Sequence, residues 1–252
     1  MGKTKNIQSI ERAMSILELF EDGNREKSVK EIALKLDLSK STVFGLINTL
    51  ANLNYLHQNE DNLKYSLGLK VLALGSAVSQ SNLLSKAANP HLQKLSFKFQ
   101  ETCLLAIEEN GFVVYIDKTE SSSSISINTR IGTKKDLFCT GVGKCFLAFM
   151  PKENADNIIN LGLRKLTPNT IDNASDLEKE LNSIRKRGFA FDNEEYELGI
   201  SCVAVPVFSN SGKIIASISL TGPTARIREI DLTDLSESLK FTAKAISGDL
   251  NV

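Results

Sequence analysis

Apolar positions in the first fifty residues recur with the 3.6-residue period of helices. The segment 7–20, "IQSIERAMSILELF", ends at the turn-forming "EDGN" and predicts a first helix. The segment 28–38, "SVKEIALKLDL", opens with Ser28 three residues before Glu31, the spacing of a capping box, and predicts a short second helix. The apolar stripe expected on the first helix consists of Ile10, Ala13, Leu17 and Phe20.

A third helix is predicted over 39–50, "SKSTVFGLINTL", with Ser39 as its N-cap. About four residues separate it from the second helix, the connection length of a helix-turn-helix. Its apolar stripe is expected at Val43, Leu46, Ile47 and Leu50. The opposite face carries small, polar and basic residues with one aromatic ring: Lys40, Ser41, Phe44, Gly45, Asn48 and Asn52.

Two short strand-like runs follow, "YLHQ" and "LKYSLG", on either side of the polar turn "NEDN". They predict a β-hairpin, which beside a helix-turn-helix would be a wing. The next segment, 70–95, reads as helical, with Pro90 breaking or restarting the helix. We therefore expect a winged helix-turn-helix domain over 1–75, a linker helix over 76–88 and a second domain over 89–252.

The second domain mixes strand-like and helical runs, so we expect an α+β fold. Strands are predicted over 102–109, 112–119, 124–131, 201–209 and 213–222. A helix is predicted over 175–188, with a capping box from Ser175 to Glu178 and Gly188 as its C-terminal stop, and another over 232–246.

Composition narrows the class of protein. The 252 residues are 42% hydrophobic, with no apolar run near the ~20 residues that span a bilayer, and the polar start lacks a signal-peptide core, so a cytoplasmic protein without membrane contact is expected. The four cysteines, Cys103, Cys139, Cys145 and Cys202, form no CxxC pair. We therefore expect free thiols and no zinc site. We also expect no other metal and no cofactor. The net charge is zero, so any nucleic-acid surface must be local.

The polar face of the third helix has two interpretations. Three solvated helices could form a small bundle without a partner. In winged helix-turn-helix proteins, however, this helix enters the major groove, where Lys and Ser reach phosphates, Asn and Lys bond base edges, and an apolar side chain meets a thymine methyl. The wing favours DNA binding. The DNA-binding candidates are Arg12, Ser39, Lys40, Ser41, Thr42, Phe44, Gly45 and Asn48.

The chain resembles the IclR-type bacterial transcriptional regulators over nearly its whole length. The segments "SIERAMSILELF" and "VKEIALKLDLSKSTVFGLINTL" are similar to their DNA-binding domain, and "CTGVGKCFLA", "IRKRGFAFDNEEYELGISCVAVPVF" and "SISLTGP" to their effector-binding domain. The resemblance implies a winged helix-turn-helix joined to a GAF-like α+β sensor, assembled as a dimer or dimer of dimers. It implies a regulator, more often a repressor, that binds a palindromic operator and responds to a small metabolite. Phe44 and Gly45 stand where members commonly carry His or Tyr followed by Arg, so the base-reading contacts do not carry over.

Residues from separated segments of the second domain are candidates for the effector pocket. Ser219 and Thr221 share one face of a predicted strand, where a pair of hydroxyls suits a small polar ligand, most simply an organic acid. Free backbone N–H groups at a helix start following Gly141 would hold an anionic oxygen. The resemblance places the ligand-binding candidates likewise: Gly141, Val142, Asp192, Ile200, Cys202, Ser219 and Thr221.

An enzyme is the rival class, because Cys139 or Cys202 could serve as a thiol nucleophile. The only two histidines, His57 and His91, lie in the predicted wing and in the helical segment 70–95, so no histidine base is expected beside either cysteine. A phosphate-binding loop at "GVGK" is excluded, because Phe138 and Cys145 stand where that motif needs Gly and Ser or Thr. A module that uses the N-terminal helices only for dimerisation remains as a third class.

Overall fold

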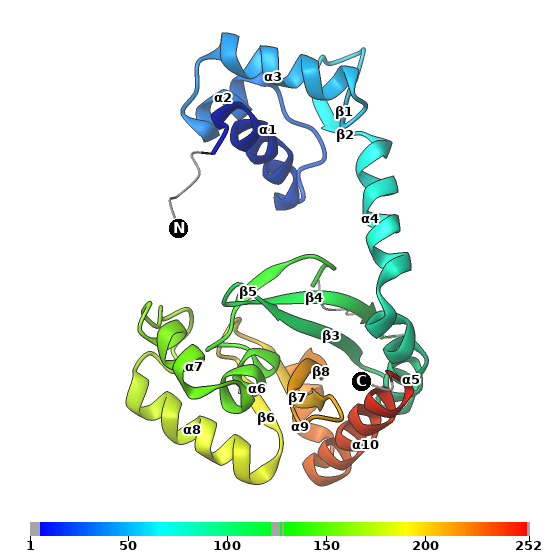
Figure 1. The fold of residues 1–252 in the computed structure, drawn as a ribbon, viewed down its shortest axis with the longest axis vertical. Helices are drawn as coiled ribbons and strands as arrows, with labels where there is room; N and C mark the ends of the chain where they lie inside the picture. The colour runs from blue at the N-terminus through cyan, green and yellow to red at the C-terminus, as the bar shows by residue number, and fades with distance from the viewer. Residues whose placement is uncertain (1–5, 122–126, 128, 251–252) are drawn as a thin grey trace. The chain divides into compact units, whose positions relative to one another are not determined.

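The computed structural model describes residues 6–121, 127 and 129–250, and Figure 1 traces them. The chain forms two compact units, Met1–Ser81 and Asn82–Val252. Each unit has its own hydrophobic core, so each is described by itself.

Unit 1 contains the predicted helix-turn-helix and wing. Strands β1 and β2 pair antiparallel with Leu56 opposite Leu67, and an isolated antiparallel bridge joins Lys27 to Tyr65 on the other edge of β2. A winged helix-turn-helix is therefore confirmed. Its elements are α1 (Gln8–Glu18), the 3₁₀ helix η1 (Leu19–Asp22), α2 (Val29–Leu36), α3 (Lys40–Asn52), β1 (Leu56–Gln58), β2 (Tyr65–Leu67) and α4 (Leu69–Ser81).

The core of unit 1 corrects the stripe expected on α1. Ile16 is fully buried, whereas Ile10 is 55% exposed. The residues of α1 and η1 that pack into the core are Ala13, Ile16, Leu17, Leu19 and Phe20, and all but Leu19 follow the i, i+3, i+4, i+7 spacing. The prediction is right for Ala13, Leu17 and Phe20 and wrong for Ile10, because two overlapping stripes fit the same helix and contact with α3 decides between them.

Local side-chain caps set the start of α2 and α3. The Ser28 hydroxyl accepts from the Glu31 amide, and the Glu31 carboxylate accepts from the Ser28 amide at 2.7 Å, which confirms the predicted capping box. Asp37, at φ 51°, ends α2 in a left-handed conformation, and the Ser39 hydroxyl then accepts from the Thr42 amide at 3.2 Å. The connection between the helices is therefore three residues, 37–39, close to the expected four.

Unit 2 is built on a six-stranded sheet in the order β5-β4-β3-β8-β7-β6, with every neighbouring pair antiparallel. The predicted strands at both ends of the unit thus meet at its centre, where Leu104 of β3 lies opposite Ser219 of β8. The strands are β3 (Thr102–Glu109), β4 (Phe112–Thr119), β5 (Lys134–Asp136), β6 (Ala190–Asn193), β7 (Ile200–Phe208) and β8 (Ile214–Pro223).

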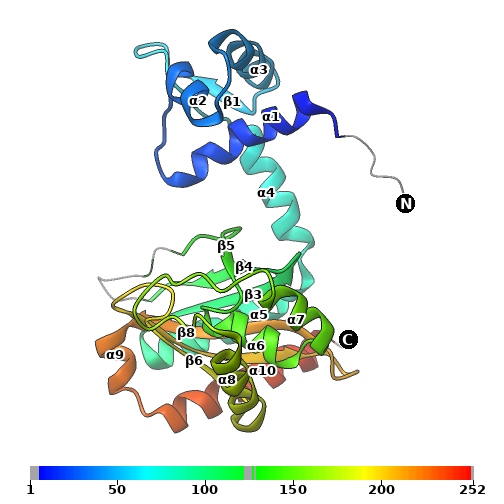
Figure 2. The ribbon, with the colours of Figure 1, turned by 90° about the vertical axis from the view of Figure 1, so that its left-hand side faces the viewer.

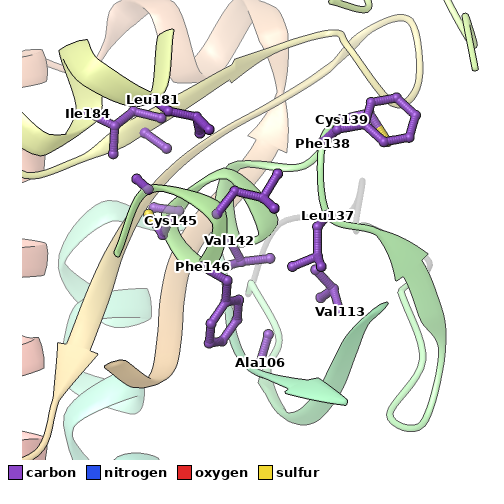
Figure 3. Close-up of a cluster of buried hydrophobic side chains, with 14 of the residues drawn as sticks. Ala106, Val113, Leu137, Phe138, Cys139, Val142, Cys145, Phe146, Leu181 and Ile184 are labelled. Carbon is purple, nitrogen blue, oxygen red and sulfur yellow. The ribbon is translucent and has the colours of Figure 1, made fainter. Parts of the chain in front are cut away.

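Helices cover both faces of this sheet, as Figure 2 shows. Alternation along the strands divides the core: Val203 and Ile218 pack toward α5 and α10, whereas Ala106 and Ala204 pack toward α6 and α8. In Figure 3, Phe146 of α6 lies beside Ala106. The helices of unit 2 are α5 (Leu83–Phe99), α6 (Gly141–Phe149), α7 (Lys152–Ile159), α8 (Ala174–Arg187), α9 (Thr224–Glu229) and α10 (Leu232–Leu250).

Three local predictions for this half of the chain differ from the structure or lie partly outside the described residues. Pro90 lies inside α5, and the helical segment is instead interrupted at Asn82, whose side chain caps α5 by accepting from the Ser85 amide. Asn173, not Ser175, caps α8, so the N-cap lies two residues earlier than predicted and the helix begins at Ala174. Half of the strand expected over 124–131 lies outside the described residues, and the four described positions, 127 and 129–131, are not in a strand.

Candidate functional site

The exposed face of α3 is polar and lies opposite the core. Val43, Ile47 and Leu50 are buried, and Leu46 is half-buried. Phe44 is 52% exposed although it is a large aromatic residue in a helix of a small domain. We call the exposed or half-buried set Lys40, Ser41, Phe44, Gly45 and Asn48 the recognition face.

Packing does not explain the glycine of the recognition face. A Cβ atom built on Gly45 would meet nothing within 4 Å, and the residue is exposed. A helical glycine costs about 0.8–1 kcal/mol relative to alanine, so its presence at an open position points to close approach of something outside the domain. The Thr49 hydroxyl donates to the Gly45 carbonyl at 2.9 Å.

The other DNA-binding candidates lie at the start of α3 or on α1. The hydroxyl of Ser39 contacts those of Ser41 and Thr42 at 2.9 and 2.8 Å, so these three groups form one cluster at the helix N-terminus. Positive backbone charge at that terminus adds to the charge of Lys40. Arg12 is half-buried on α1.

The wing is held by an acidic residue from another segment. Glu26 accepts from the side-chain amides of Asn59 and Asn62 at 2.8 and 2.7 Å, which fixes both ends of the wing turn. These bonds lower the pKa of Glu26, because they favour the ionised carboxylate. The turn itself carries Glu60 and Asp61 and no Lys or Arg, so its tip offers no cation to a phosphate.

Unit 2 contains a cavity of about 240 Å³ between the sheet and the segments before α6 and after β6. This volume is below the ~300–1,000 Å³ typical of drug-sized ligands, so its occupant must be small. Four of the seven ligand-binding candidates line it: Asp192, Ile200, Cys202 and Thr221. The remaining lining residues are Leu104, Tyr115, Ile127, Thr129, Lys135, Thr140, Tyr196 and Glu197.

Gly141, Val142 and Ser219 do not line the cavity but lie close to residues that do. A Cβ on Gly141 would be 2.6 Å from the Cys202 sulfur, so this glycine permits α6 to approach β7. The Ser219 hydroxyl contacts that of Thr221 at 3.2 Å, and Val142 packs in the core with Phe146. The Gly143 amide binds the Thr140 hydroxyl at 3.1 Å, so it is not free for a ligand as the sequence suggested.

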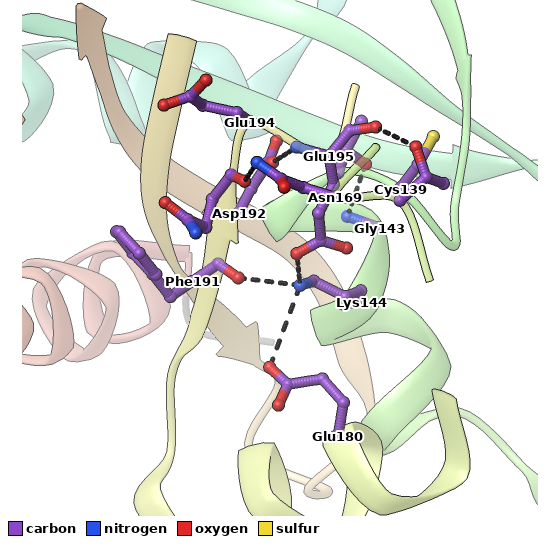
Figure 4. Close-up of polar contacts among 12 residues, drawn as sticks. Cys139, Gly143, Lys144, Asn169, Glu180, Phe191, Asp192, Glu194 and Glu195 are labelled. Atoms are coloured by element: carbon purple, nitrogen blue, oxygen red, sulfur yellow. Dashed lines mark hydrogen bonds and ion pairs between the residues drawn. The ribbon is translucent and has the colours of Figure 1, made fainter. Parts of the chain in front are cut away.

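A buried charge network lies beside the cavity (Figure 4). Lys144 of α6 is 1% exposed, and its ammonium donates to the Glu195 carboxylate and to the Phe191 carbonyl at 2.7 Å, with Glu180 at 3.8 Å. The Glu195 amide in turn donates to the Asp192 carboxylate at 2.8 Å. The network therefore holds the cavity-lining carboxylate of Asp192 in place relative to α6.

Burial changes the acidity of these groups. Desolvation raises the pKa of Asp192 to about 7, with Glu195 adding to the rise and Lys144 opposing it. Desolvation likewise raises the pKa of Glu195, against the opposing effect of Lys144. Within the described residues, the second carboxylate oxygen of Glu195 is buried without a hydrogen-bond partner. Asp192 can thus present either a donor or an acceptor to a ligand near neutral pH.

The thiols offer no nucleophile. All four cysteines are free and buried, as expected for a chain without disulfides. Burial, with a smaller contribution from Asp192, raises the pKa of Cys202, and burial raises that of Cys139 to about 12, so both stay protonated near neutral pH.

In the part of the chain that the structure describes, no group of three or more His, Cys, Asp or Glu residues is placed to hold a metal ion. No described helix has the length and apolar character needed to cross a membrane.

A larger hollow of about 780 Å³ lies beside α6 and α7. Its only charged lining residues, Glu108 and Lys213, are both exposed, and it contains none of the buried ionisable groups. The smaller cavity is therefore the better candidate for a ligand site, because it brings buried polar groups from separate segments to one place.

Sequence reasoning missed several cavity residues, among them Tyr115, Lys135 and Tyr196. Tyr115 lies within an apolar strand-like run and looks like an ordinary core residue, and Lys135 follows another lysine, as solvated residues often do. Only the pairing of β5 with β4 brings Lys135 and Tyr115 to one site. The phenolic group of Tyr115 within a buried strand was the one available signal, since a buried hydroxyl needs a partner.

A winged helix-turn-helix followed by an α+β unit with a small polar cavity defines a DNA-binding protein with a ligand-binding domain. Comparison with known families agrees. Residues 9–60 match the IclR helix-turn-helix domain, and residues 75–248 match the C-terminal domain of the bacterial transcriptional regulator IclR. The chain belongs to the IclR family, whose members are transcriptional regulators rather than enzymes.

Individual relatives are similar over nearly the whole chain. The HTH-type transcriptional regulator XynR of Escherichia coli is 34% identical over 242 residues, 96% of each chain. The regulator KdgR of the same organism is 32% identical over 97% of this chain and 93% of its own. The crystal structure of a Thermotoga maritima IclR protein superposes with a TM-score of 0.79 at 34% identity, covering 98% of this chain and all of that one.

Proposed function

We propose that this protein is a transcriptional repressor that binds a palindromic operator as a dimer or dimer of dimers, and that a small organic acid in the cavity of unit 2 changes its operator affinity. The observation that carries the proposal is the recognition face on α3 in the same chain as a cavity with a buried carboxylate and a lysine. Relatives named as repressors, such as AllR of Escherichia coli at 30% identity over 98% of this chain, support the repressor assignment.

The recognition face suits the major groove. Lys40 and Ser41 lie at the N-terminus of α3, where charge and backbone N–H groups favour phosphate contacts that position the protein. Phe44 and Asn48 lie one and two turns further along the same face, where an amide can bond a base edge and a ring can meet a thymine methyl. Because residues 1–75 carry 10 basic and 9 acidic side chains, a net +1, one copy makes few phosphate contacts.

Exposed apolar side chains support the dimer. On α4, Leu69, Leu72, Leu74 and Val78 are all at least half exposed. On and before α1, Ile7, Ile10 and Met14 are exposed at i, i+3 and i+7. Apolar stripes of this kind are uncommon on monomers, and a second copy of the chain would cover them while placing two recognition faces on a two-fold operator.

The cavity supports an acid as ligand by its size and its side chains. Lys135 supplies a cation, and Asp192, Thr140 and Thr221 supply hydrogen-bonding groups for a hydroxyl or carbonyl. A structure of an IclR homologue from Microbacterium hydrocarbonoxydans, similar in fold with a TM-score of 0.85 at 21% identity, contains 4-hydroxybenzoate. That finding concerns the homologue, and it motivates including hydroxylated acids among the first ligands tested here.

The DNA half is tested by selecting binding sites from a random-sequence duplex pool with the full-length protein. We expect selected sites with two related half-sites, bound by a dimer or larger assembly in light scattering. Lys40→Ala should weaken binding to selected and random DNA alike and reduce the salt slope by about one. Asn48→Ala should mainly reduce the preference for selected sites. Unchanged binding in both variants would remove α3 from the DNA interface.

The sensor half is tested by measuring the affinity for the selected site in the presence of each acid that raises the melting temperature. A ligand that binds only the native state raises the apparent stability, and it changes DNA affinity only if it binds the two conformations differently. Steady conversion of a bound acid to product would contradict the proposal that this domain binds without turnover.

A further inference from the structure

Strand β5 places two consecutive lysines on opposite sides of the sheet. Val114 pairs with Lys134 and Val113 with Lys135. Lys134 is exposed and lies 3.6 Å from Glu109 in a surface ion pair. Lys135 points the other way and lines the cavity.

The ammonium of Lys135 contacts aromatic rings, and no described residue forms a salt bridge with it. Its nitrogen lies 3.8 Å from the ring centre of Tyr196 and 5.7 Å from that of Tyr115. Among the described residues, Lys135 makes neither a salt bridge nor a side-chain hydrogen bond, although Glu197 also lines the cavity. Lys144, by comparison, has three oxygen partners.

This difference leaves Lys135 with unused hydrogen-bonding capacity. An ammonium has three donors, and rings satisfy none of them as well as an oxygen does. Desolvation lowers the pKa of Lys135, with Glu197 opposing the change, which shows that the cation is held in a partly dry site at a cost. Glu197 is exposed and therefore screened by solvent, and Asp192, which also lines the cavity, makes no ion pair with Lys135 among the described residues. The donors of the Lys135 ammonium are therefore open to a ligand carboxylate.

We propose that Lys135 is the residue that makes the cavity selective for acids: it binds the carboxylate of a small hydroxylated monocarboxylic acid, while Asp192, Thr140 and Thr221 face the hydroxyl groups of that acid. The proposal rests on the proposed sensor function and adds a specificity-determining residue to it. The proposal also places the carboxylate of the ligand at Lys135 instead of the start of α6, because the Gly143 amide there already donates to the Thr140 hydroxyl.

The test compares acids with their neutral amides in the full-length protein. The probes are lactate and lactamide, gluconate and gluconamide, and 4-hydroxybenzoate and 4-hydroxybenzamide, with affinities measured by calorimetry or thermal shift. Lys135→Met keeps an apolar chain of similar length against the tyrosines and removes the charge. Lys135→Arg keeps the charge, and Lys134→Met removes the exposed neighbouring charge as the matched control.

We expect the wild-type protein to bind at least one acid more tightly than its amide. In Lys135→Met that acid should lose about 10–100-fold in affinity, the worth of a charge-assisted hydrogen bond, while the amide binds as before. Lys135→Arg should restore most of the acid preference, and Lys134→Met should match wild type. Retained amide binding shows that the variant is folded.

The two proposals fail in different ways. An acid that binds wild type and Lys135→Met equally would overturn the role of Lys135 and leave the sensor function standing. Preference for an amide over its acid in wild type would also overturn it. Absence of binding by all six probes to wild-type protein would contradict the sensor function as proposed, and the role of Lys135 with it.

Discussion

Replacing Gly45 by alanine separates the stability of unit 1 from its DNA binding. The glycine lies in the middle of α3, and an added Cβ meets nothing within 4 Å. Alanine should therefore stabilise the domain by about 0.5–1 kcal/mol, because glycine loses more backbone entropy in a helix. For a unit of this size that corresponds to a rise of roughly 2–8 °C in melting temperature.

The same methyl group should weaken operator binding. It projects from the recognition face, between Phe44 and Asn48 in the chain, where the backbone of α3 is expected to approach the DNA. A forced displacement in a packed interface costs about 1–3 kcal/mol, which is a loss of at least about fivefold in affinity. The two effects have opposite signs, so a general loss of folding cannot imitate the predicted result.

The assays are thermal unfolding without DNA and titration of a labelled duplex selected by the wild-type protein. Gly248→Ala is the control, because Gly248 is a helical glycine on α10 whose Cβ would also meet nothing within 4 Å, and its position in unit 2 is far along the chain from α3. It should leave DNA affinity unchanged. A Gly45→Ala protein that is more stable and binds the duplex as tightly as wild type would refute the argument that this glycine serves close approach to DNA.

Two further predictions concern unit 2. Burial raises the pKa of Asp192 to about 7, above its ordinary 3.8. The contribution of Asp192 to the free energy of unfolding is therefore fully present below pH 4 and is lost as the pH rises through 7. In a denaturation series from pH 4 to 8, Asp192→Asn should reduce this dependence of stability on pH. Gly143→Ala should prevent unit 2 from folding, since the new Cβ would lie 2.2 Å from the Leu137 carbonyl oxygen, and a Gly143→Ala protein with native circular dichroism and melting temperature would contradict that geometry.

Local patterns predicted the parts of the fold that local interactions determine. The helices of unit 1 and the Ser28 capping box could be inferred, because caps and apolar periodicity act within a few residues. Where two local solutions competed, the sequence could not decide: Ile10 and Ile16 both complete a helical stripe, and Asn173 and Ser175 are both good N-caps. In each case tertiary contacts or the exact start of the helix selected one.

The cavity was only partly predictable for a different reason. Asp192, Cys202 and Thr221 come from β6, β7 and β8, which are neighbours in both sequence and sheet. Tyr115 and Lys135 come from β4 and β5, on the far side of β3. The alternation of apolar and polar residues within one strand does not predict the order of strands in the sheet. Ser219 was placed on the correct face with Thr221, but its side chain lies beneath the cavity wall.

The buried pair of Lys144 and Glu195 also constrains how this sequence can change over time. Removing Lys144 leaves the buried Glu195 carboxylate without its cation, and removing Glu195 leaves Lys144 with the more distant Glu180 carboxylate at 3.8 Å. Breaking a buried pair in this way costs about 3–5 kcal/mol, whereas exchanging both partners for apolar residues of similar volume is often neutral or favourable. Each position should thus appear intolerant when it is varied alone and become permissive when both are varied together. Functional variants at these two positions should therefore arise mainly by substitution of both residues. A scan of single substitutions would underestimate how many residue types the two positions tolerate.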